Sequence, residues 1–319
     1  MSTAALAHDP AWPRTGGWAP LPADARAPVD LALVGVPTFA TSLSPTRAHE
    51  TPAAIRAALQ RYSSHVAWPG SDHARGAERE LVLVLDEALT IADAGDLAEP
   101  DSAHGERAAT ARIAELAARA RLVVALGGDN ALTVPAALGV AGNRLADAGL
   151  ITVDAHHDLR DGRSNGSPVR RLIEAGLHPH RIVQIGIADF ANSRVYRERA
   201  RSLGITVIHR DELHDRRLAD VAAEALEIAG AAGGPIHVDL DVDVCDRSVA
   251  PGCPASIPGG IQAHELRQMA RLFAADPRVR GIDIAEVDAT ADTPDGRTVR
   301  LAALLVLEAA TGLALRLQK

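Results

Sequence analysis

Short runs of apolar, largely β-branched residues alternate along this chain with longer segments in which apolar side chains recur every three or four positions. The short runs are typical of strands buried on both faces, because they contain few polar positions. We predict strands at residues 31–36, 122–126, 150–153, 181–185, 204–208, 235–240 and 281–284.

The longer segments have helical periodicity and predict helices between these strands. They comprise residues 104–120, 131–139, 168–174, 193–203, 215–229, 263–275 and 297–317. A further helix is expected after residue 50. In it Thr51 would be the N-cap and Pro52 the first helical residue, with Ile55 and Leu59 on one face.

Repeated alternation of strand and helix predicts a mostly parallel central sheet covered by helices on both faces, which is a three-layer α/β/α fold. We expect residues 1–30 to form an N-terminal extension and residues 31–319 to form a single catalytic domain. Ligand sites in such folds lie beyond the carboxyl ends of the strands. Polar residues at those ends are therefore the main candidates for chemistry.

Two acidic segments follow predicted strands. Asp154, His156 and Asp158 come directly after one strand, and Asp241 and Asp243 follow another. Alternate residues of an extended strand share one direction, so continued strands would bring each set to one spot. Four carboxylates gathered there would repel one another, and two divalent cations would balance their charge. Oxygen-rich ligation with one or two nitrogen ligands favours Mn²⁺, and metals so held lower the pKa of water.

Composition narrows the range of partners. The 319 residues carry a net charge of −8, which argues against nucleic acid and anionic membranes as partners and leaves a small molecule. Cys245 and Cys253 are too few for a disulfide framework and fit a reducing cytosol, so we expect a cytoplasmic protein. We expect no membrane span and no signal peptide.

The acidic segments resemble the motifs of the ureohydrolase family, which includes arginase, agmatinase and formimidoylglutamase. The family's Asp-Ala-His-x-Asp motif matches residues 154–158, and its Asp-x-Asp-x-x-Asp motif matches residues 241–246, whereas Asp239 is an extra acid for which a rim or supporting position is expected. The resemblance implies an arginase-like fold, two manganese ions and a trimeric or hexameric homo-oligomer. It also implies a set of metal ligands: Asp154, His156, Asp158, Asp241 and Asp243.

One departure from the family affects the metal site. Residues 127–130 read Gly-Gly-Asp-Asn where relatives have Gly-Gly-Asp-His, so Asn130 replaces a metal-binding histidine. Asn130 Oδ1 and the family's ligating ring nitrogen are both attached to Cγ, so Asn130 is expected to reach the same metal. A neutral oxygen holds manganese less tightly than imidazole does, which predicts one weak ion beside a tighter one at His156. The alternative is that Asn130 only caps a helix starting at Ala131.

A second departure affects the substrate. Arginases and agmatinases carry a proton-shuttling histidine where this chain has Asn165, whereas formimidoylglutamases resemble this chain in lacking it. The resemblance implies that Ser164 and Asn165 contact substrate. Arg160 is suited to a substrate carboxylate, because a guanidinium binds one through two parallel hydrogen bonds. Arg170 and Arg171 either contribute to this site or form a solvated helical face.

Glu286 matches the family glutamate that pairs with the planar cation of an amidine, and Asp158 and Glu286 are the expected catalytic residues. The leading hypothesis is hydrolysis of N-formimidoyl-L-glutamate to L-glutamate and formamide. Asp158, His157 and a water remain alternatives for the proton donor. A guanidino-compound hydrolase releasing urea, such as an agmatinase or guanidinobutyrase, is the second hypothesis, and a metal-poor, non-catalytic family member is the third.

Overall fold

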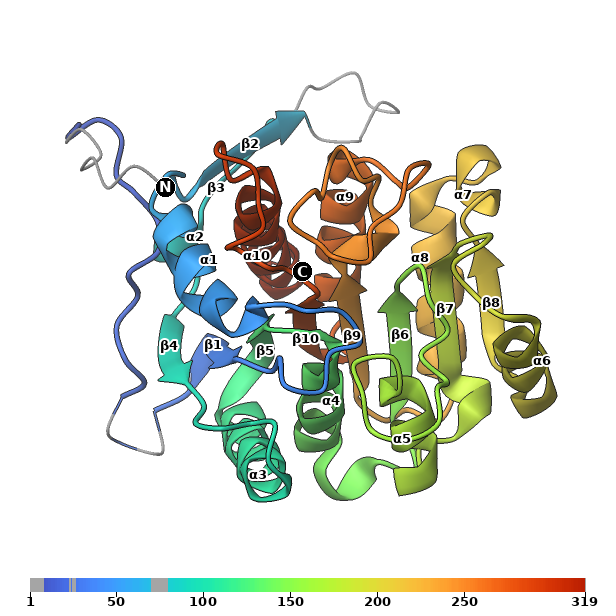
Figure 1. The fold of residues 1–319 in the computed structure, drawn as a ribbon. Coiled ribbons are helices and arrows are strands. Elements are labelled where there is room, and N and C mark those ends of the chain that lie inside the picture. The colour runs from blue at the N-terminus through green and yellow to red at the C-terminus, as the bar shows by residue number, and fades with distance from the viewer. Residues whose placement is uncertain (1–8, 23, 25–26, 70–79, 319) are drawn as a thin grey trace, which may run out of the picture.

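The centre of the molecule is an eight-stranded parallel sheet (Figure 1) with the strand order β4-β1-β5-β10-β9-β6-β7-β8. The structure is a computed structural model that describes residues 9–22, 24, 27–69 and 80–318. The strands of this sheet are β1 (Val29–Val36), β4 (Ile91–Asp96), β5 (Ala120–Gly127), β6 (Gly149–Val153), β7 (Ile182–Ile187), β8 (Thr206–His209), β9 (Ile236–Asp241) and β10 (Val279–Ala285).

Helices cover both faces of the sheet, which confirms the predicted three-layer α/β/α architecture. One face is covered by α1 (Thr51–Leu59), α8 (Leu218–Ala229), α9 (Ala263–Ala274) and α10 (Arg297–Leu317). The other is covered by α3 (Ala103–Arg119), α4 (Thr133–Ala141), α5 (Pro168–Ala175) and α6 (Arg194–Leu203). Two short helices are α2 (Leu85–Ala88) and α7 (Glu212–Asp215).

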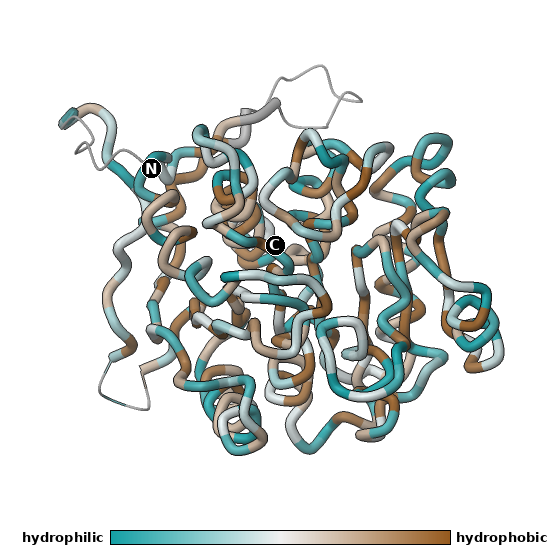
Figure 2. Tube along the Cα trace, viewed as in Figure 1, coloured by the Kyte–Doolittle hydropathy of each residue, from teal (hydrophilic) through white to brown (hydrophobic). Residues whose placement is uncertain are grey.

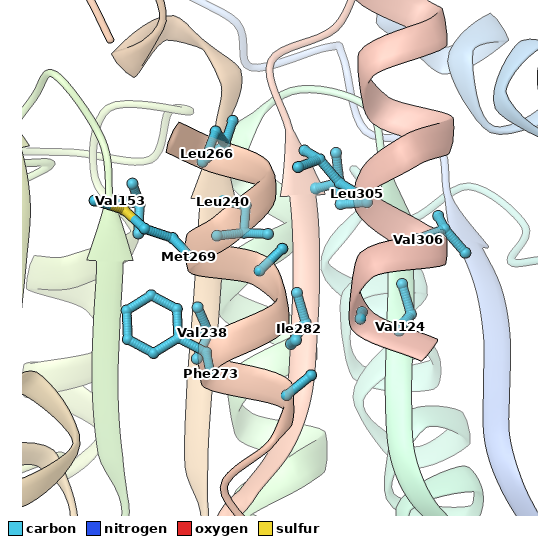
Figure 3. Close-up of a cluster of buried hydrophobic side chains, with 14 of the residues drawn as sticks. Val124, Val153, Val238, Leu240, Leu266, Met269, Phe273, Ile282, Leu305 and Val306 are labelled. Carbon is cyan, nitrogen blue, oxygen red and sulfur yellow. The ribbon is translucent and has the colours of Figure 1, made fainter. Parts of the chain in front are cut away.

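Apolar residues colour much of the interior of the trace, and polar residues are frequent on the outer loops (Figure 2). Figure 3 shows how α9 fills the space above β9 and β6, where Phe273 and Met269 lie against Val238 and Val153. Phe273 is fully buried, so truncation to alanine would cost about 3–5 kcal/mol of unfolding free energy. This dense core gives the strand ends fixed positions.

Helix α10 is long and apolar enough, by length and composition alone, to cross a membrane. However, 83% of its most apolar window is buried inside the protein. A helix that is apolar on all sides and enclosed by a fold is a core helix. The apolar residues of α10 pack against α9 and α1.

The sequence prediction missed three strands. β4 has the sequence Ile-Ala-Asp-Ala-Gly-Asp, which lacks an apolar run because it lies at the sheet edge, where β1 is its one neighbouring strand among the described residues. An edge strand faces solvent along one side, so its sequence carries a weak signal. The other two, β2 (His65–Pro69) and β3 (Glu80–Val84), form a separate antiparallel pair.

Two predicted helix starts also differ from the structure. Thr51 is not the N-cap of α1, because a 3₁₀ turn (Ala48–Glu50) leads into the helix and Glu50 takes the cap position. The Thr51 hydroxyl instead donates a 2.5 Å hydrogen bond to the Val287 carbonyl. The predicted helix at 215–229 is divided, since Arg216 and Arg217 are extended and α8 begins at Leu218.

Candidate metal centre

The two acidic segments lie at the ends of neighbouring strands, because β6 pairs with β9 and Val153 lies beside Leu240. The strands do not continue in extended form through these acids, which was the condition for alternate residues to share one direction. The chain bends after Val153, and Asp158 adopts a left-handed conformation with φ of 51°. Asp243 lies in a 3₁₀ turn that follows β9 directly. Turns, not strand alternation, therefore direct these side chains toward one another.

Asp154, His156 and Asp243 form the tightest group. One ligand atom of each residue lies within 4.8 Å of the others, and His156 Nδ1 is 2.7 Å from Asp243 Oδ2. The Ala155 amide donates to Asp243 Oδ1 at 3.0 Å and the His156 amide to Asp154 Oδ1 at 2.6 Å. Asp154 Oδ2 is buried and has no hydrogen-bond partner. An unpaired buried carboxylate oxygen is costly unless a cation binds it, so this donor set fits a divalent metal.

The electrostatics of the group reflect crowded negative charge. The Asp243 charge, opposed by burial, raises the pKa of His156 to about 12. Burial, followed by the Asp243 charge, raises the pKa of Asp154 to about 6. Burial and neighbouring carboxylates also raise the pKa values of Asp158 and Asp241 well above their usual range. Without a metal, protons must therefore provide the positive charge that these acids require.

Asn130 faces Asp158 at the edge of this group. Its Nδ2 donates a 2.5 Å hydrogen bond to Asp158 Oδ2, and its Oδ1 accepts one of 2.6 Å from Thr133 Oγ1. The alternative that Asn130 only caps a helix is wrong, because Asp129 accepts the hydrogen bond from the Ala131 amide and is the cap. The side-chain amide of Asn130 would have to flip, so that Oδ1 takes the place of Nδ2, to present oxygen to a metal.

Glu286 follows β10 with φ of 61° and is buried. Its Oε1 accepts hydrogen bonds from the Asn130 amide at 2.9 Å and from Asn165 Nδ2 at 2.7 Å. Asn165 is held in turn by the Leu43 amide, which donates to Asn165 Oδ1 at 3.0 Å. Burial, followed by the Asp129 charge, raises the pKa of Glu286 to about 7. Asn165 therefore orients Glu286.

A cavity of about 320 Å³ joins these residues. Its lining includes Asn130, His156, Asp158, Arg160, Asn165, Asp241, Asp243 and Glu286. Asp154 is fully buried and lies outside this lining, as does Ser164, whose hydroxyl accepts a 3.3 Å hydrogen bond from the Gly166 amide. His157 also lies outside the lining, and its Nδ1 is 2.7 Å from Gln184 Oε1. Of the two side chains expected as proton donors, Asp158 therefore lines the cavity and His157 does not.

The neighbouring arginines differ in their partners. The guanidinium groups of Arg170 and Arg171 form ion pairs with Glu174 and Glu106, respectively, so neither is available to a ligand in the cavity. Arg160 lines the cavity and forms no ion pair with the described residues. Of these three arginines, Arg160 is thus the one whose charge no ion pair among the described residues compensates.

Comparison with known proteins identifies the family of this chain. Residues 29–312 match the sequence model of the arginase family. The chain belongs to the arginase family. This match confirms the resemblance that the acidic motifs indicated, and it extends over most of this arginase-family chain.

Its relatives include a formimidoylglutamase from Bacillus subtilis (strain 168), 33% identical over 293 residues that cover 89% of this chain and 87% of the relative. The crystal structure of that formimidoylglutamase aligns with a TM-score of 0.84 and 27% identity, covering 99% of this chain and 96% of the other. A guanidinopropionase from Pseudomonas aeruginosa is 34% identical over 59% of each chain. A Trypanosoma cruzi formiminoglutamase, crystallised with Mn²⁺, shares the fold at 22% identity and a TM-score of 0.76, covering 90% and 94%.

Some residues of this arginase-family site carried no sequence signal. Tyr196 lines the cavity from the first turn of α6, and no motif marks it. Asp239 lies inside the sheet and away from any rim: it is fully buried, pairs in register with Asp283 on β10, and neither of its carboxylate oxygens has a hydrogen-bond partner. Its alternation with Asp241 in the sequence indicated a polar strand end but gave no sign of its depth.

Proposed function

We propose that this protein hydrolyses the formimidoyl C–N bond of N-formimidoyl-L-glutamate in a metal-dependent reaction that yields L-glutamate and formamide. The Bacillus subtilis relative and its crystal structure, both formimidoylglutamases, support the reaction. The geometry supports the substrate class, because the cavity contains groups for both ends of such a molecule.

The observation that carries the proposal is that Arg160, a guanidinium without an ion pair among the described residues, and the buried carboxylate of Glu286 line the same cavity. Glu286 suits the planar amidinium of the formimidoyl group, since two N–H bonds of an amidinium match one carboxylate. Arg160 suits a substrate carboxylate for the same geometric reason. A substrate with an amidine at one position and a carboxylate at another fits this pair.

The proposed metal ligands are Asp154, His156, Asp158, Asp241, Asp243 and Asn130, which would hold two Mn²⁺ ions. The orphaned Asp154 Oδ2 and the oxygen-rich donor set support such a site. Metals bound there would lower the pKa of water and so supply a nucleophile at neutral pH. Within the chain, Glu286 orients the amidine carbon, and Asp158 is the proposed proton carrier. Asn165 keeps Glu286 in place.

The decisive experiment is hydrolysis of N-formimidoyl-L-glutamate by manganese-loaded protein, with formamide, glutamate and ammonia measured together. Equal release of formamide and glutamate is the expected result. Ammonia in place of formamide would mean that the other C–N bond breaks, and no turnover would contradict the proposal. Arg160→Ala should weaken the binding of this substrate and leave the binding of agmatine, which has no carboxylate, unaffected. Arg170→Ala is the matched control, because the Arg170 guanidinium is already paired with Glu174.

A second candidate is hydrolysis of a guanidino compound to release urea, which the relationship to guanidinopropionase supports. Urea release from guanidino acids or agmatine, with no turnover of the formimidoyl substrate, would favour it. A cytoplasmic location and a trimeric or hexameric homo-oligomer belong to the same family-based proposal. Light scattering on purified protein tests the oligomer.

A further inference from the structure

Tyr196 is held at the edge of the cavity by the start of α6. Its amide donates a 3.3 Å hydrogen bond to Oγ of Ser193, the helix cap. Its ring is partly buried against a hydrophobic cluster that includes Leu159 and Leu172. The ring is therefore anchored on one side by the core, while Tyr196 also lines the cavity.

Two guanidinium groups lie against this ring. The Cζ atom of Arg160 is 5.8 Å from the ring centroid, and that of Arg199 is 5.6 Å from it. Both distances are within the range at which a cation is attracted to an aromatic ring. Tyr196 thus links the candidate carboxylate anchor to a second arginine.

The two arginines have different roles. Arg199 Nη1 donates to the Leu159 carbonyl at 2.6 Å and to Asp161 Oδ1 at 2.8 Å, so its charge is compensated and it fastens the chain on both sides of Arg160. The Arg160 backbone is also fixed, since its amide donates to Gly166 and its carbonyl accepts from Arg170 Nε. Among the described residues, the Tyr196 ring is the one cation-attracting partner found for the Arg160 guanidinium.

We propose that Tyr196 is a positioning residue that holds the Arg160 guanidinium toward the cavity and thereby determines the preference for carboxylate-bearing amidines. This inference rests on the proposed function, in which Arg160 binds the substrate carboxylate. A long, exposed arginine loses rotamer freedom when it binds a ligand, and an arginine already ordered by a ring loses less. The contribution of Tyr196 therefore appears in substrate binding and leaves the chemical step unchanged.

The test compares Tyr196→Leu with Tyr196→Phe. Tyr196→Leu should raise KM for N-formimidoyl-L-glutamate about 3- to 30-fold with kcat little changed, which is the range expected for one cation–π contact. Tyr196→Phe keeps the ring and should retain the wild-type KM. Agmatine, if turned over, should show no change in either variant. A loss of kcat without a change in KM, or an equal loss in both variants, would overturn the inference.

A double-mutant cycle with Arg160→Ala separates positioning from a general structural effect. If Tyr196 acts through Arg160, Tyr196→Leu has no further effect once Arg160 is removed. An undiminished effect of Tyr196→Leu in the Arg160→Ala background would refute the inference. The cycle is also measured as L-glutamate binding to manganese-loaded protein by calorimetry. Ring-dependent L-glutamate binding without turnover of the formimidoyl substrate would keep the inference and reject the proposed function.

Discussion

Manganese binding at this centre is expected to release a proton from His156. The Asp243 charge raises the pKa of His156 to about 12, and Nδ1 lies 2.7 Å from Asp243 Oδ2. A histidine must be neutral to bind a metal, so this proton has to leave. At about pH 7.5 its removal costs about 6 kcal/mol, because the pKa is about 4.5 units higher and each unit corresponds to about 1.36 kcal/mol. The metal has to supply this free energy on binding.

The assay is calorimetric titration of metal-free protein with Mn²⁺, from about pH 6.5 to about pH 8.5, in buffers of different ionisation enthalpy. Release of the His156 proton alone makes the affinity of this site rise about tenfold per pH unit. Asp158 and Asp241, whose pKa values are also raised, add to this dependence. In His156→Gln the imidazole proton is absent, but Asp154 and Asp243 lose the neighbour that lowers their pKa values, so the protons released on metal binding come from these acids instead. An affinity for Mn²⁺ that is independent of pH in the wild type would refute the reasoning.

Three further predictions concern single residues. Glu286→Gln keeps an acceptor for Asn130 and Asn165 but removes the charge proposed to face the amidine. The value of kcat/KM should therefore fall about 10- to 150-fold, which corresponds to the loss of a hydrogen bond of about 1.5–3 kcal/mol to a charged group. Elemental analysis should find the same manganese content as in the wild type. Wild-type protein should bind two Mn²⁺ ions with unequal affinity, and Asn130→His should raise the affinity for the more weakly bound ion about 10-fold or more. Two equally tight ions in the wild type would contradict this. Asp239 has a pKa well above its usual range because of burial and the Asp283 charge. An acid whose pKa is raised in the folded state stabilises the protein below its unfolded pKa of about 3.9 and loses that contribution as pH rises through the folded value. Urea unfolding of metal-free Asp239→Asn should therefore show a weaker fall in stability with rising pH than wild type, and identical profiles would exclude this role.

The centre of the fold was predictable because burial leaves a strong trace in sequence. β5 and β6 carry mostly apolar runs, and the ends of β6, β9 and β10 carry acids that converge on the cavity. β4 was missed for the opposite physical reason, since an edge strand need not be apolar on both faces. The roles of Arg170 and Arg171 stayed open in the sequence because ion pairs with Glu174 and Glu106 depend on side-chain positions.

The backbone at Asp158 and Glu286 explains why motif spacing could not predict the geometry of the cavity. Two of the four non-glycine residues with positive φ in the described chain are these acids, at 51° and 61°. Such a conformation costs of the order of 1–3 kcal/mol and persists only where the surroundings impose it. At Glu286 the surroundings are the buried end of β10 and a 3.0 Å hydrogen bond from its amide to the Gly128 carbonyl. Gly128 has no room for a side chain, since a Cβ there would lie 2.0 Å from the Thr38 carbonyl oxygen. The Gly-Gly turn is therefore needed to place Glu286 at the cavity, although it contributes no side chain to the lining.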